Sequence, residues 1–113
     1  MIKIYHNNRC SKSRCGLELL EQSGKKFIVI KYLEDVPTKN ELKDIINLLG
    51  IKPIDLIRKN EAIWKEQFKG KTLSDAQLID AMLKNPKLIE RPIVINGNKA
   101  TIGRPPEKIL DII

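Results

Sequence analysis

Residues 2–33, "IKIYHNNRCSKSRCGLELLEQSGKKFIVIKYL", contain the clearest pattern of secondary structure in this chain. Residues 2–5 alternate apolar and polar side chains, as a half-buried strand does. Apolar side chains at helical spacing begin near Ser13, and the Ser-Gly pair at 23–24 is a typical helix stop. The nearly continuous apolar run of residues 26–33 predicts a second strand, buried on both faces. A strand, a helix and a strand in this order predict a βαβ unit with parallel strands.

The middle of the chain predicts mostly helices. Thr38–Glu41 has the pattern of a capping box, and the helix that it opens should end at Gly50. Ser74–Gln77 is a second capping box, and Asn85-Pro86 should end its helix. Shorter helical pieces are expected over residues 52–60 and 61–68.

The last part of the chain predicts strands again. Residues 92–95 and 99–102 are short β-type runs, and Asn96-Gly97 between them is a strong signal for a hairpin turn. A final helix is expected over residues 104–113, where Ile109, Leu110 and Ile113 should form its buried side.

This order of elements predicts an α/β fold of the thioredoxin-like class. We expect a four-stranded mixed sheet flanked by helices, with a helical insertion of about residues 38–85 between the second and third strands. A chain of 113 residues suits one domain, so we expect residues 1–113 to form a single thioredoxin-like domain.

Charge and composition limit the classes of partner. The net charge is +7, which favours anionic partners such as a small oxyanion or an acidic protein. Aromatic residues make up only 4 %, so direct nucleic-acid binding through a stacking platform is not expected. No apolar run approaches the roughly 18 residues that a membrane span needs. We therefore expect a cytoplasmic protein without a membrane partner. Because no exposed apolar stripe stands out in the sequence, we expect a monomer.

The two cysteines lie five positions apart at the first strand-to-helix junction. Cys10 falls at the helix N-terminus, where backbone N–H groups and nearby basic side chains should lower the thiol pKa. The same groups would attract an oxyanion. A Cys10–Cys15 disulfide should not form readily, because helix geometry separates their Cα atoms by about 8–9 Å. The two thiols and His6, the only histidine, fall short of a usual metal-ligand set, so no metal site is expected.

Segments spread over the chain resemble the arsenate reductase family that works with glutathione and glutaredoxin. The resemblance rests on "YHNNRCSKSR", "KYLEDVPTKNEL", "LIRKNE", "LSDAQLIDAML", "LIERPIVI" and "GRPPEKILDI", which follow one another in the family's order. Two residues depart from the family pattern. The family commonly has proline at the position of Asn8, and it usually has no thiol at the position of Cys15. The resemblance implies a thioredoxin-like fold with a helical insertion.

The same resemblance implies a set of site residues. Cys10 stands at the position of the catalytic nucleophile and His6 at that of a histidine near the thiol, which we count with the catalytic residues. The oxyanion-binding positions hold Arg58, Arg91 and Arg104. Arginine suits this role because its charged, forked donors match the oxygens of a tetrahedral anion. Arg91-Pro92 stands where thioredoxin-like folds place a cis-proline.

The implied activity is reduction of arsenate to arsenite. The Cys10 thiolate would attack arsenic(V), and glutathione and glutaredoxin would supply the electrons. Glutathione is then a co-substrate, and no bound cofactor is expected.

Two other functions fit the same sequence. One is a redox-responsive transcriptional regulator that binds RNA polymerase; such regulators usually carry C-x-x-C, whereas here Ser13 occupies the second cysteine's place. The other is a glutathione-dependent thiol oxidoreductase without arsenate activity, whose basic pocket would hold the carboxylates of glutathione.

Overall fold

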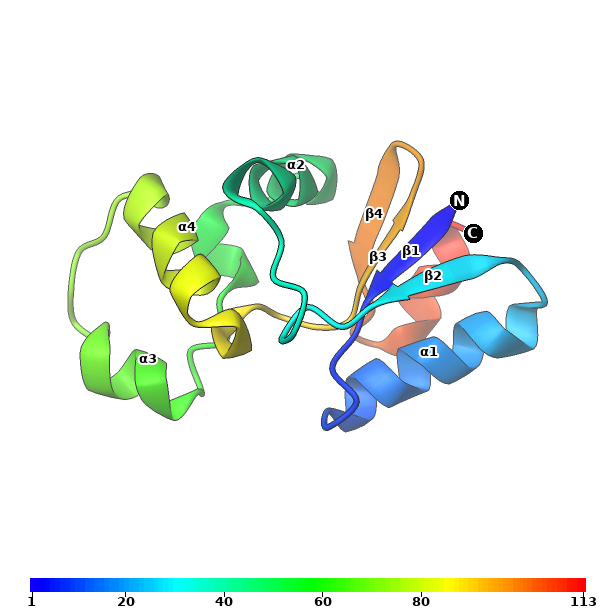
Figure 1. Ribbon diagram of the computed structural model, residues 1–113, viewed down its shortest axis with the longest axis horizontal. Helices are drawn as coiled ribbons and strands as arrows, with labels where there is room; N and C mark the ends of the chain where they lie inside the picture. Colours follow the sequence, from blue (N-terminus) through cyan, green and yellow to red (C-terminus); the bar gives the residue numbers. More distant parts are fainter. The chain divides into compact units, whose positions relative to one another are not determined.

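A four-stranded sheet organises the two ends of the chain (Figure 1), and its strands run in the order β2-β1-β3-β4. Strand β1 is parallel to β2 and antiparallel to β3, which is antiparallel to β4. The mixed sheet predicted from the sequence is therefore confirmed. The strands are β1 (Ile2–Tyr5), β2 (Phe27–Ile30), β3 (Ile93–Asn96) and β4 (Lys99–Ile102).

The computed structural model describes residues 1–113, which divide into two units. The sheet unit comprises residues 1–35 and 91–113, and the helical unit comprises residues 36–90. The helical unit lies between the second and third strands, where the sequence predicted a helical insertion of about residues 38–85. That the whole chain behaves as a single domain stays a prediction.

The sheet unit has its core on one face of the sheet. Helix α1 (Ser11–Ser23) and the 3-10 helix η3 (Pro106–Asp111) pack against each other, and Figure 1 shows both on the same side of the strands. Helix α1 ends at Gly24, whose positive φ of 73° makes the left-handed cap that glycine favours. The shared core cluster consists of Ile2, Ile4, Leu20, Val94 and Ile109.

Strand β2 differs from its predicted burial. Ile28 and Val29 are 46 % and 38 % exposed, although the apolar run predicted burial on both faces. The reason is topological, because β2 is an edge strand with a neighbour on one side only. An apolar run by itself does not distinguish an edge strand from a central one.

The C-terminal elements also differ in detail from the prediction. The hairpin register pairs Asn96 with Lys99, so the two turn residues are Gly97 and Asn98 rather than Asn96 and Gly97. Gly97 has φ of 64° in the first turn position, where a type II′ turn requires glycine. Ile109 is buried and Ile113 packs against the core, as expected, but Leu110 is exposed. A 3-10 helix repeats every three residues, so Ile112 rather than Leu110 lies on the same side as Ile109 and also packs against the core.

The helical unit follows the predicted capping boxes. The side chain of Thr38 accepts from the Glu41 N–H, and that of Ser74 accepts from the Gln77 N–H. Gly50 and Asn85 end the two helices as predicted. None of the chain's helices combines the length and the hydropathy needed to span a membrane. The elements are α2 (Lys39–Leu49), η1 (Pro53–Leu56), α3 (Ala62–Gln67), α4 (Asp75–Lys84) and η2 (Pro86–Leu88).

Candidate active site

The cysteine loop joins β1 to α1 through a tight turn. The Cys10 N–H donates to the Asn7 carbonyl at 3.0 Å, and the Asn7 side-chain oxygen accepts from the Arg9 N–H at 3.0 Å. This side-chain bond two residues along is the usual way in which asparagine stabilises a turn. Cys10 is the N-cap of α1, so the sulfur lies at the helix N-terminus, as the sequence predicted. The Asn8 carbonyl is held by Arg14 Nη1 at 2.9 Å.

A buried cluster behind the loop fixes its shape. Ser13 is fully buried, and its Oγ lies 2.6 Å from His6 Nδ1 and accepts from the Asn7 N–H at 3.0 Å. Burial lowers the pKa of His6, and the positive charge of Lys31 lowers it further, so the imidazole is neutral at pH 7. Ser13 was not among the predicted site residues. The sequence feature that could have identified Ser13 as a site residue is its position in the first turn of the helix, three residues after Cys10.

The ends of the β3–β4 hairpin bring two arginines together. Ile93 pairs with Ile102. Continuing this register outward by two residues places Arg91 near Arg104, and Arg104 Nε donates to the Arg91 carbonyl at 2.8 Å. The Arg91-Pro92 peptide bond is cis. Hairpin register thus explains why the Arg104 guanidinium reaches the backbone carbonyl of Arg91, 13 residues away.

Two glycines let α1 approach this hairpin closely. A Cβ atom on Gly16 or on Gly103 would lie 2.9 Å from Pro92 Cγ and 3.0 Å from Ile109 Cδ1, closer than real Cβ contacts. The absence of a side chain at Gly16 therefore permits α1 to contact Pro92, next to Arg91, and its absence at Gly103, next to Arg104, leaves room for Pro92 and for Ile109 of η3. This packing brings the N-terminus of α1 to the arginine pair.

The Cys10 sulfur is surrounded by positive groups. Arg104 Nη2 donates to Sγ at 3.3 Å. Burial by itself raises the pKa of the Cys10 thiol. That effect is outweighed by the Ser13 and Lys12 backbone N–H groups and the Arg91 guanidinium, which lower the pKa below its ordinary value. The sheet unit thus brings together four predicted site residues: His6, Cys10, Arg91 and Arg104.

Arg58 lies in the helical unit, between two acidic side chains. Its Nη1 donates to Glu90 Oε1 at 3.2 Å, and its Nε forms an ion pair with Glu61 Oε1 at 3.7 Å. The sequence predicted Arg58 as an oxyanion ligand but did not indicate either carboxylate.

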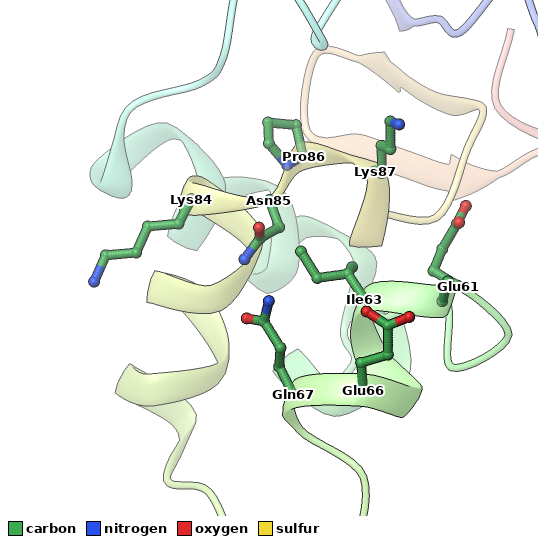
Figure 2. A pocket seen from close by; sticks show the side chains of 9 residues that line it. Glu61, Ile63, Glu66, Gln67, Lys84, Asn85, Pro86 and Lys87 are labelled. Carbon is green, nitrogen blue, oxygen red and sulfur yellow. The ribbon is translucent and has the colours of Figure 1, made fainter.

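The helical unit also contains a cavity of about 500 Å³ between α3 and the end of α4. Figure 2 shows the side-chain amides of Gln67 and Asn85 directed toward each other, with Ile63 to one side of them. Glu61 is the lining residue that also contacts Arg58. The second cysteine, Cys15, is an exposed free thiol on α1. No three histidine, cysteine or acidic side chains gather as a metal site.

Comparison with known proteins gives close matches over nearly the whole chain. The sequence model of the ArsC family matches residues 5–112. The "Arsenate reductase" of Haemophilus influenzae is 46 % identical over 112 residues, covering 97 % of each chain. The "Uncharacterized protein YfgD" of Escherichia coli is 46 % identical over 99 % of this chain and 96 % of its own length. The structure "Arsenate reductase from Vibrio cholerae" superimposes with a TM-score of 0.94 at 47 % identity, covering 99 % of this chain and 97 % of its own.

Proposed function

The chain belongs to the ArsC family, and on that basis we propose that it is an oxidoreductase that reduces arsenate to arsenite. The observation that carries this proposal is the Cys10 sulfur at the N-terminus of α1, with a lowered pKa and the Arg104 guanidinium 3.3 Å away. A thiolate is the reactive form of a cysteine nucleophile. Guanidinium groups beside it reduce the repulsion between the thiolate and an incoming anion.

In the proposed reaction, the Cys10 thiolate attacks arsenic(V), a sulfur–arsenic bond forms, and one arsenate oxygen leaves as water after protonation. A glutathione thiolate then attacks the Cys10 sulfur, and the sulfur–arsenic bond breaks with its electron pair on arsenic, so that arsenic(III) leaves as arsenite. Cys10 and glutathione are left as a mixed disulfide, which glutaredoxin and further glutathione reduce to regenerate the Cys10 thiol. No bound metal or organic cofactor takes part in this scheme.

The other site residues have separate parts in the proposal. Arg91 and Arg104 bind the arsenate oxygens beside Cys10, and the family resemblance implies the same role for Arg58. His6 is a positioning residue, because its neutral ring holds the Ser13 side chain while the Ser13 backbone N–H donates to the Cys10 sulfur. Ser13 therefore joins the histidine to the nucleophile.

Turnover of arsenate by matched cysteine variants tests the proposal. The assay contains arsenate, glutathione, glutaredoxin and glutathione reductase, and it follows NADPH oxidation. We expect turnover with the wild type and with Cys15→Ser, whose thiol is exposed on α1, and none with Cys10→Ser. Alanine at each of the three arginines should raise KM for arsenate roughly tenfold or more, whereas Lys99→Ala on the hairpin should not.

The competing functions give different results in the same experiment. Turnover of a glutathionylated peptide by a wild type that leaves arsenate unchanged would replace the proposal with a thiol oxidoreductase. Retention of RNA polymerase on the immobilised protein, together with no turnover of either substrate, would favour the regulator.

A further inference from the structure

Backbone pairing in the helical unit sets Arg58 beside Glu90. Ile57 and Ile89 form an isolated antiparallel bridge. The Arg58 N–H donates to the Leu88 carbonyl at 2.7 Å, and the Glu90 N–H donates to the Leu56 carbonyl at 2.8 Å. Both side chains therefore start from a fixed backbone, and their contact does not depend on a flexible loop.

A second carboxylate reaches the same guanidinium from the start of α3. Glu61 is the N-cap of α3, and its N–H donates to the Arg58 carbonyl at 3.2 Å. Figure 2 shows Glu61 at the beginning of this helix, on the edge of the cavity. The short turn between the two residues keeps Glu61 Oε1 within 3.7 Å of Arg58 Nε.

The three side chains are only about a quarter exposed. Their exposed fractions are 22 % for Arg58, 24 % for Glu90 and 26 % for Glu61. Partly buried charges interact more strongly than exposed ones, because less water screens them. The two carboxylates therefore offset much of the positive charge that Arg58 would otherwise offer to an anion.

We propose that Glu90, assisted by Glu61, is a positioning residue that holds the Arg58 guanidinium in place and competes with the oxyanion for its charge. This inference rests on the proposed function, in which Arg58 is an oxyanion ligand. It predicts two separable effects. Loss of the Glu90 contact should free the guanidinium, and loss of the Glu90 charge alone should strengthen oxyanion binding.

The first effect is measured without arsenate, by the rate at which phenylglyoxal modifies Arg58. Peptide mass spectrometry reads this rate, with Arg9 and Arg14 in the same digest as internal references. Glu90→Ala should accelerate modification of Arg58 several-fold and leave both reference rates unchanged. Asp80→Asn, which removes the carboxylate of the exposed Lys39 pair in the same unit, is the matched control and should have no effect. An unchanged Arg58 rate in Glu90→Ala would overturn the positioning role.

The second effect is measured as the arsenate concentration that half-protects Cys10 from iodoacetamide. Glu90→Gln keeps a hydrogen-bond acceptor but removes the charge, so half-protection should need up to about fivefold less arsenate. The change should vanish when Arg58→Ala is added, because the two residues then no longer interact. Equal protection of wild type and Glu90→Gln would refute the competition. No protection of the wild type would instead overturn the proposed function, and the phenylglyoxal rates would still decide the positioning role.

Discussion

Arg104 in the sheet unit and Arg58 in the helical unit are both partly buried, and they donate to different kinds of acceptor. Arg104 bonds a backbone carbonyl and the Cys10 sulfur. Arg58 faces the carboxylates of Glu90 and Glu61. Neutral carbonyls hold a guanidinium without cancelling its charge, whereas carboxylates hold it and cancel it. The charge of Arg104 can therefore act on the thiol, whereas the charge of Arg58 is shared with two carboxylates, with which an oxyanion would have to compete.

The largest stability effect that separates the two arginines is expected for Arg58→Ala. This variant leaves two partly buried carboxylates close together without the cation between them, which should lower the free energy of unfolding by about 1–3 kcal/mol. Urea denaturation measures the loss. Lys39→Ala, which breaks the exposed pair with Asp80, should cost less than about 0.5 kcal/mol. Equal losses of unfolding free energy in the two variants would show that partial burial does not strengthen the ion pairs of Arg58.

A smaller effect is expected from pH, and it concerns the support behind the cysteine loop. The pKa of His6 is lowered in the folded protein, so the unfolded chain binds a proton more readily. The contribution of His6 to stability is then complete above its unfolded pKa of about 6.5 and is lost as pH falls through the lower folded value. Because the chain has one histidine, comparison with His6→Gln isolates the contribution of His6 to the free energy of unfolding.

Urea denaturation midpoints of the wild type and of His6→Gln at pH 7.5, 6.5 and 5.5 measure this contribution of His6 to stability. The advantage of the wild type should shrink toward the lowest pH. A constant difference across this range would contradict the neutral, buried state of His6.

Local sequence signals predicted the helices and strands better than they predicted the burial and the register of those elements. The capping boxes at Thr38 and Ser74 work within one helical turn, so the sequence alone sufficed to place both helices. The exposure of Ile28 depends on which strands neighbour β2, and no local pattern contains that information. The hairpin turn lies one residue later than predicted, because the cross-strand register determines which residues are unpaired and form the turn.

The site shows the same division between local and long-range information. The position of Cys10 at the helix N-terminus followed from the strand-to-helix junction. The contact between Arg104 and Cys10 joins residues 94 positions apart, and only the family resemblance pointed to it. Ser13 and Glu90 were missed because their partners are set by loop geometry and by an isolated backbone bridge.

The most direct test of the central claim is the pKa of the Cys10 thiol, measured from the pH dependence of its alkylation by iodoacetamide. Cys15→Ser provides the background in which a single thiol reacts. We expect half-maximal reactivity below the value of about 8.5 for free cysteine, and a shift upward when Arg91→Ala is added. A thiol pKa at or above that of free cysteine, unmoved by loss of the guanidinium, would contradict the account.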